Sequence, residues 1–217
     1  MPLFLLIRHG ENDYVKKGFL AGRTPGVNLN KAGQEQARLL AEKLAAAPIK
    51  AIYSSPLERA LQTAEPLAKA LGVEVSLRPG LTEVEVGDWT GMKLNRLRSQ
   101  KLWNVVQFSP SRMQFPGGET FAQAQYRICQ ELEVLSKQHE PMDLVICVTH
   151  ADPIRLAVAY FVGMPLDTFQ RLAVAPASIT ALFLGEMGCQ LLALNVPLKP
   201  DLKFLATIKP PKPKSKK

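Results

Sequence analysis

Two short apolar runs constrain the fold of this chain more than any other feature of its sequence: Leu3–Ile7 and Leu144–Val148. An unbroken apolar run of this length is typical of a strand that is buried on both faces, as in the centre of a parallel sheet. Parallel strands need crossover connections, usually helices, which cover the two faces of the sheet. The two runs therefore predict an α/β fold in which both form central strands.

The segments between and after these runs supply the expected helices. Apolar residues recur at helical spacing in four places, which are 37–44, 57–71, 119–136 and the residues after Asp152-Pro153. Two strand-like segments, 179–184 and 190–194, flank a glycine-containing turn and predict an antiparallel hairpin at one sheet edge. The order of elements predicts a three-layer α/β/α sandwich, with a mostly parallel sheet and one antiparallel edge strand.

The sequence also predicts where one helix begins. Ala51–Tyr53 is predicted to be a strand, and Ser55 follows it closely. Ser55 suits the N-cap, Pro56 suits the first helical position, and Glu58 lies three residues after Ser55, as in a capping box. We therefore expect this helix to begin at Pro56.

The composition indicates one domain with a basic tail. The chain has 217 residues, of which 47% are hydrophobic, enough for one ordinary core. Residues 197–217 hold seven Lys and one Asp, so the net charge of +8 falls to +2 for the rest of the chain. We expect a domain at residues 1–196 and a mobile, Pro- and Lys-rich tail at 197–217. Because the body is nearly neutral, no nucleic-acid partner is expected. A tail that contacts nucleic acid or an acidic membrane is the alternative to a solubilising end.

Neither a metal site nor a membrane segment is predicted. The cysteines Cys129, Cys147 and Cys189 are far apart and show no metal-ligand spacing, so neither a disulfide framework nor a zinc site is expected. No apolar stretch reaches the roughly 20 residues of a spanning helix. Arg8 and His9 close the N-terminal apolar run too early for an export signal. We expect a cytoplasmic protein without cofactor, metal or membrane contact.

Polar residues follow three of the predicted strands directly. They are Arg8-His9-Gly10, Ser54-Ser55 leading to Arg59, and Thr149-His150. Ligands of α/β sheets bind at the C-terminal ends of the strands, so these residues are expected to share a site at exposed strand ends. Two guanidinium groups and a helix N-terminus suit a dianionic phosphoryl group, and their charge favours the neutral imidazole that can attack phosphorus. Each histidine alone could merely cap a core strand, but the combination favours a phosphoryl site.

These residues belong to a longer series of motifs. In chain order the series is LIRHGE at Leu6–Glu11, LNKAG at Leu29–Gly33, YSSPLERA at Tyr53–Ala60, LTE at Leu81–Glu83, GDWTG at Gly87–Gly91, FPGGE at Phe115–Glu119 and VTH at Val148–His150. This series resembles the histidine phosphatase superfamily, also called phosphoglycerate mutase-like, up to about residue 195. The resemblance implies the phosphoglycerate mutase-like form of the predicted sandwich.

The resemblance also implies roles for individual residues. By it, His9 is the nucleophile that becomes phosphohistidine, and Arg8, Arg59 and His150 hold the phosphoryl oxygens. Glu83 is implied as the acid and base. From the residues alone, Glu83 would be interpreted as an ordinary solvated loop carboxylate.

The choice of Glu83 over Glu85 rests on register. The family pattern places the acid six residues before a tryptophan, which is Trp89 in this chain. Glu85 is the next residue to consider.

Two positions depart from the family pattern. Asn12 stands where Ser or Thr is common, but its amide can still donate to a phosphate, so it is a binding candidate. Ala151 stands where Gly is usual, which requires that its φ is not positive. Arg23, in a Gly- and Pro-containing loop, is a candidate contact for a substrate anion, with an ordinary exposed arginine as the alternative.

The implied activity is metal-independent hydrolysis of a small phosphomonoester through phosphohistidine on His9. A phosphomutase of the phosphoglycerate mutase type would use the same residues. The chain lacks the longer insertions of that branch, which favours hydrolysis. A non-catalytic phospholigand-binding protein is a third possibility, which the intact set of candidate residues disfavours.

Overall fold

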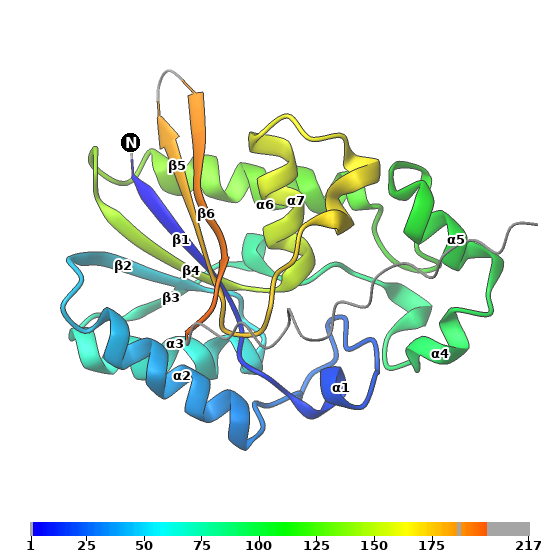
Figure 1. The fold of residues 1–217 in the computed structure, drawn as a ribbon, viewed down its shortest axis with the longest axis horizontal. Helices are drawn as coiled ribbons and strands as arrows, with labels where there is room; N and C mark the ends of the chain where they lie inside the picture. Colours follow the sequence, from blue (N-terminus) through cyan, green and yellow to red (C-terminus); the bar gives the residue numbers. More distant parts are fainter. Residues whose placement is uncertain (1, 186–187, 199–217) are drawn as a thin grey trace, which may run out of the picture.

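The computed structural model describes residues 2–185 and 188–198. Its six-stranded sheet has the order β3-β2-β4-β1-β5-β6 (Figure 1). The strands are β1 (Leu3–Arg8), β2 (Ile49–Ser54), β3 (Val75–Leu77), β4 (Leu144–Thr149), β5 (Ile179–Gly185) and β6 (Gly188–Val196). The first four run parallel to one another, and β5 runs antiparallel to both of its neighbours. The predicted sheet, with an antiparallel hairpin at one edge, is confirmed.

Helices cover both faces of the sheet, as Figure 1 shows. Two of them, α2 (Lys31–Leu44) and α3 (Glu58–Leu71), lie on one face, and α6 (Phe121–Ser136) and α7 (Ala151–Phe161) lie on the other. The short helices are α1 (Asp13–Lys16), α4 (Leu94–Leu97) and α5 (Lys101–Phe108), and 3₁₀ turns lie at Pro79–Leu81, Gly87–Trp89, Pro110–Arg112 and Leu166–Arg171. The three-layer sandwich is therefore the observed architecture.

The two apolar runs form central strands because their side chains alternate between two cores. Phe4 and Leu6 of β1 and Val145 of β4 belong to the core under α6 and α7, whereas Ile7 and Val148 belong to the core under α2 and α3. All five side chains are completely buried. Burial of each is worth about 1.5–3 kcal/mol, so any exposed position for these strands would be costly.

Helix α3 begins later than the sequence predicts. Its N-cap is Leu57, which makes no side-chain capping bond, so the predicted capping box is wrong. Ser55 instead pairs its Oγ with Nε2 of His150 at 2.8 Å. The Glu58 carboxylate accepts the N–H of Gly26 at 2.9 Å. The two side chains that were predicted to form the capping box therefore bond to His150 and Gly26 instead.

The structure bears on several further predictions. Helix α7 begins at Ala151, whose φ is not positive, as its side chain requires. The three cysteines are free thiols, two of them buried and Cys189 partly buried. No helix in the described ranges is long and apolar enough to span a membrane, and a cytoplasmic location stays a prediction.

The C-terminal boundary is visible only in part. Strand β6 ends at Val196, and Leu198 is packed in the core under α2 and α3. Residues 199–217, which make up most of the predicted tail, lie outside the described residues.

Candidate active site

The sheet places the two candidate histidines side by side. β1 pairs with β4 in a register that sets Arg8 opposite Thr149, and the His9 N–H donates to the Thr149 carbonyl at 2.9 Å. His9 and His150 therefore leave the sheet at the same end, with ring centroids 5.1 Å apart. Contrary to the prediction of an exposed strand end, His9 is only 3% exposed. The loops that follow the strands cover it.

The environment of His9 keeps its imidazole neutral. Burial is the main cause that lowers its pKa well below the ordinary 6.5, and the charges of Arg59 and Arg8 lower it further. The hydrogen bond between Nδ1 and the Gly10 carbonyl, 2.7 Å long, acts in the opposite direction. A carbonyl can only accept, so Nδ1 carries the hydrogen. The lone pair is consequently on Nε2, which is the form that a nucleophile needs.

Two glycines let the loop after β1 reach this geometry. A Cβ atom on Gly10 would lie 2.7 Å from the carbonyl oxygen of Gly33, and one on Gly33 would lie 2.1 Å from that of Glu11. Asn30 caps α2 by accepting the Gly33 N–H at 2.9 Å. A side chain at either glycine would push the loop away from α2 and displace His9. The LIRHGE and LNKAG motifs therefore meet in one close backbone contact, between the loop after β1 and the start of α2.

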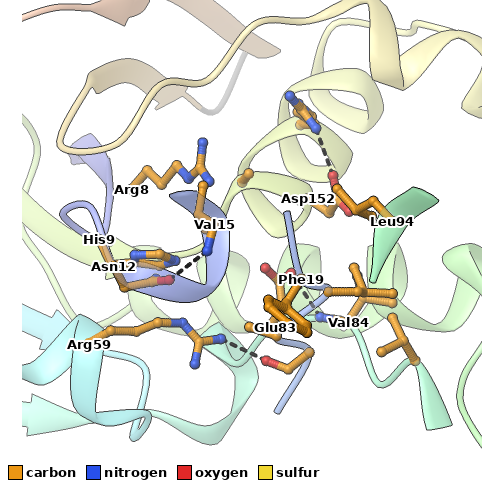
Figure 2. Close-up of a pocket in the computed structure, with 16 residues that line it drawn as sticks. Arg8, His9, Asn12, Val15, Phe19, Arg59, Glu83, Val84, Leu94 and Asp152 are labelled. Atoms are coloured by element: carbon orange, nitrogen blue, oxygen red, sulfur yellow. Dashed lines mark hydrogen bonds and ion pairs between the residues drawn. The ribbon is translucent and has the colours of Figure 1, made fainter. Parts of the chain in front are cut away.

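Arg8, Arg59 and Asn12 surround His9 with hydrogen-bond donors (Figure 2). Arg8 and Arg59 each donate a hydrogen bond from one terminal nitrogen to a backbone carbonyl, at 2.7 Å in both cases. Asn12 caps α1 with its Oδ1, which accepts the Val15 N–H. Four nitrogens are buried and have no hydrogen-bond partner among residues 2–185 and 188–198: Arg8 Nε, Arg59 Nε and Nη1, and Asn12 Nδ2. Buried donors are seldom left unpaired, so these nitrogens suit an anionic ligand.

His150 is held by the end of β2. Ser55 Oγ accepts the Leu57 N–H, which leaves its own hydroxyl hydrogen for Nε2 of His150. This arrangement favours a hydrogen on Nδ1. That atom is buried 4.0 Å from Oε2 of Glu83 and has no hydrogen-bond partner in the described part of the chain. Burial, and then the charge of Arg59, lower the pKa of His150 well below 6.5. His150 is therefore a neutral donor beside Glu83.

The surroundings of Glu83 raise the pKa of its carboxyl group. Burial is the main cause that raises its pKa to about 7, and the nearby charge of Asp152 adds to this effect. The Val84 N–H, Arg59 and Arg8 act in the opposite direction. A carboxyl group with such a pKa can donate and accept a proton at neutral pH. Glu85, in contrast, lies outside the cavity and pairs with Arg23 at 3.0 Å.

Most of these groups line a cavity of about 260 Å³, which suits a small ligand, but His150 is not among its lining residues. The cavity wall combines the polar groups Arg8, His9, Asn12, Arg59 and Glu83 with the apolar residues Val15, Phe19, Leu20 and Leu94. Asp152 and Arg155 add an ion pair of 2.9 Å. Sequence reasoning missed this pair, although its i, i+3 spacing in the helix after His150 indicates that both side chains lie near the site.

Arg23 does not reach this cavity. Its guanidinium pairs with Glu85 and Glu119, each at 3.0 Å, and lines a separate groove. This position argues against the predicted contact with a substrate anion.

Comparisons with known proteins agree with this geometry. A family model described as "Histidine phosphatase superfamily (branch 1)" matches residues 4–197. Phosphoserine phosphatase 1 of Hydrogenobacter thermophilus is 29% identical, covering 90% of this chain and 93% of its own. A 2,3-bisphosphoglycerate-dependent phosphoglycerate mutase of Thermoplasma acidophilum is 30% identical, covering 84% and 87%. The solved structure of a phosphoserine phosphatase from Entamoeba histolytica, in complex with 3-phosphoglyceric acid, is 28% identical with a TM-score of 0.80, covering 91% and 98%.

Proposed function

Because this chain belongs to the histidine phosphatase superfamily, whose members are phosphatases and phosphomutases, we propose that it hydrolyses a small phosphomonoester through a phosphohistidine on His9. One observation carries the proposal: buried donors of Arg8, Arg59, Asn12 and His150 gather around the neutral imidazole of His9. Neither these donors nor its Nε2 has a hydrogen-bond partner among the described residues. A dianionic phosphoryl group satisfies these donors and offers phosphorus to Nε2.

The first step forms the phosphoenzyme. Nε2 of His9 attacks phosphorus while the bond from phosphorus to the ester oxygen breaks. Glu83, in its protonated form, gives its proton to the departing alkoxide. Arg8, Arg59 and Asn12 bind the non-bridging oxygens, and His150 donates from Nδ1. These charged groups and donor atoms are in place before the reaction, so little reorganisation of the site is needed.

The second step releases phosphate. The Glu83 carboxylate takes a proton from water, whose oxygen attacks the phosphorus of phosphohistidine. The bond between nitrogen and phosphorus breaks, and its electron pair returns to Nε2. Inorganic phosphate leaves, and Glu83 is again protonated.

The cavity wall supports a substrate with charged groups besides its phosphate. The carboxylate of Asp152 and the guanidinium of Arg155 offer opposite charges to an ammonium and a carboxylate of the substrate. Phosphoserine carries both groups, and two of the similar proteins bear the name of a phosphoserine phosphatase. We therefore place phosphoserine first among candidates, with 3-phosphoglycerate second.

A phosphomutase is the second candidate, favoured by the similarity to the Thermoplasma acidophilum mutase. The deciding experiment follows phosphoserine and 3-phosphoglycerate by ³¹P nuclear magnetic resonance, with and without 2,3-bisphosphoglycerate. Hydrolysis releases inorganic phosphate from the preferred substrate. Conversion of 3-phosphoglycerate to 2-phosphoglycerate, with little free phosphate, would instead identify a mutase. The His9→Ala variant is the blank for both reactions.

The proposed acid role predicts a pH dependence. Glu83 has a raised pKa of about 7, so its acid form predominates below that pH and is lost above it. We expect kcat/KM for an alkyl phosphate to fall tenfold per pH unit well above pH 7. The lowered pKa of His9 keeps the nucleophile neutral through the same range. A profile that stays flat from pH 6.5 to pH 9 would contradict this role.

Chelation is expected to leave the activity unchanged. Arg8 and Arg59 supply the positive charge that stabilises the transferred group. Within residues 2–185 and 188–198, no three His, Cys, Asp or Glu side chains are grouped as metal ligands. Turnover is measured with and without EDTA, after dialysis. A loss of activity that a divalent ion restores would overturn the proposed mechanism.

A further inference from the structure

The proposed acid lies on a loop that one arginine of α6 holds in place. Arg127 Nη1 donates to the carbonyls of Gly80 and Thr82, each at 2.8 Å, and its Nη2 donates to that of Glu83 at 3.3 Å. The same Nη2 donates to the Glu119 carboxylate at 2.7 Å. A planar guanidinium with several fixed donors can bind several carbonyls at once, which an ammonium does less well.

A second arginine also donates to the Glu83 carbonyl. Arg23 Nε donates to the Glu83 carbonyl at 2.8 Å, and its terminal nitrogens pair with Glu85 and Glu119. Glu119 Oε1 accepts from both Arg23 and Arg127, and also from the Glu85 N–H at 2.9 Å. One carboxylate therefore offsets the repulsion between two guanidinium groups that bind one backbone oxygen.

The segment that carries Glu119 is fitted against the acid loop at the backbone. A Cβ atom on Gly118 would lie 2.2 Å from the Glu85 carbonyl oxygen, and one on Gly87 would lie 2.0 Å from that of Pro116. The Glu119 N–H donates to the Glu85 carbonyl at 2.9 Å. This close fit accounts for the FPGGE motif, whose residues do not line the active-site cavity.

We propose that Arg127, joined to Arg23 through Glu119, positions the acid Glu83 for proton transfer without touching the substrate. None of these three supporting side chains lines the cavity that Glu83 lines. Their side chains are 16–31% exposed, so their charges are only partly screened by solvent. Their effect reaches the reaction through the Glu83 backbone. The proposal rests on the proposed acid role of Glu83.

The test compares the Arg127→Met variant with Glu83→Gln and with the double variant. The maximal rate of phosphoenzyme formation is measured by rapid mixing for an alkyl phosphate, which needs a proton, and for p-nitrophenyl phosphate, which does not. We expect Arg127→Met to slow the alkyl reaction about tenfold and the p-nitrophenyl reaction little, with unchanged half-saturating concentrations. Arg127→Lys is expected to recover part of the rate. In the Glu83→Gln background, Arg127→Met should have no further effect, since both act through one group.

Arg78→Met is the matched control. Arg78 pairs with Glu131 of the same helix α6 at 2.6 Å, with comparable burial, and its side chain makes no hydrogen bond to residues 80–85. It should lower thermal stability as Arg127→Met does, without any dependence on the leaving group. Should Arg127→Met fail to fold, Glu119→Gln replaces it with the same expected selectivity.

Each outcome decides between the two proposals. Selective losses in both Glu83→Gln and Arg127→Met, with no additivity, support the positioning role. A selective loss in Glu83→Gln alone, with an equal or absent effect in Arg127→Met, overturns the positioning role and leaves the acid in place. If Glu83→Gln itself shows no selectivity, the acid assignment is wrong and the positioning role is overturned with it.

Discussion

Replacing His9 by alanine is expected to lower the rate of phosphoryl transfer by at least ~10⁴-fold, because no other group can take the place of its Nε2. The fold should survive. Among the described residues the imidazole makes one side-chain hydrogen bond, to the neighbouring Gly10 carbonyl. It borders an existing cavity, so its removal creates no new closed void in the hydrophobic core. A loss of this size without unfolding is the signature of a nucleophile.

Two measurements check this result. Circular dichroism and thermal melting establish that the variant is folded. Quenching in alkali after mixing with ³²P-labelled substrate should trap a phosphoenzyme in the wild-type protein only, and this label should be lost on later treatment with acid, as expected for phosphohistidine. Activity near the wild-type level in a folded His9→Ala variant would exclude His9 as the nucleophile.

The second large effect is expected from Glu83→Gln. Loss of the acid should slow phosphoenzyme formation from an alkyl phosphate by about 100-fold or more, because its alkoxide cannot leave without a proton. A nitrophenolate leaves unaided, so p-nitrophenyl phosphate should form the phosphoenzyme at a nearly normal rate. The amide cannot activate water, and the phosphoenzyme should then accumulate. With a pKa of about 7, Glu83 is already partly neutral at pH 7, so an isosteric neutral amide should fit without large destabilisation.

The leaving-group dependence separates proton transfer from simple support. Loss of charge repulsion or of packing would change the rates of both substrates alike. An equal effect on the two phosphorylation rates would therefore remove Glu83 from proton transfer. Asp152, the other carboxylate that lines the cavity, would be the next residue to test in place of Glu85, which is engaged with Arg23.

The central features of the fold could be predicted because they depend on local patterns. The apolar runs of β1 and β4 identify central strands from five residues each, and the parallel register then brings His9 and His150 together. The alternation of strands and helices gives the layers. These inferences need only the period of the apolar residues and the chemistry at the strand ends.

Long-range side-chain partners could not be predicted in this way. Ser55 has the spacing of a helix cap, but His150, 95 residues away, takes its hydroxyl. Arg23 lies in a Gly- and Pro-containing loop, which is typical of an exposed arginine, yet its Nε donates a hydrogen bond to the Glu83 carbonyl. A local pattern does not encode which of several compatible partners lies within reach after folding. Glu83 itself was identified by resemblance to a family, since nothing in its local sequence reveals its burial.

The segment between Gly91 and Pro116 shows the same limit. From the sequence alone, Trp103 and Phe108 could either line a substrate pocket or pack against the core. Trp103 stacks on Trp89 with ring centroids 6.3 Å apart, and Phe108 is 77% exposed. Neither lines the cavity of His9.

The burial that makes His9 and His150 neutral also limits how acidic a solution the fold can tolerate. Each histidine has a lowered pKa in the folded state. Below pH 6.5 both imidazoles are therefore protonated in the unfolded chain while they stay neutral in the folded chain. This proton linkage lowers the free energy of unfolding as the pH falls below 6.5. Glu83, whose pKa is raised to about 7, acts in the opposite sense between pH 7 and 4.5 and offsets part of this loss. The two histidines proposed for catalysis therefore make the native state less stable as the pH falls below 6.5.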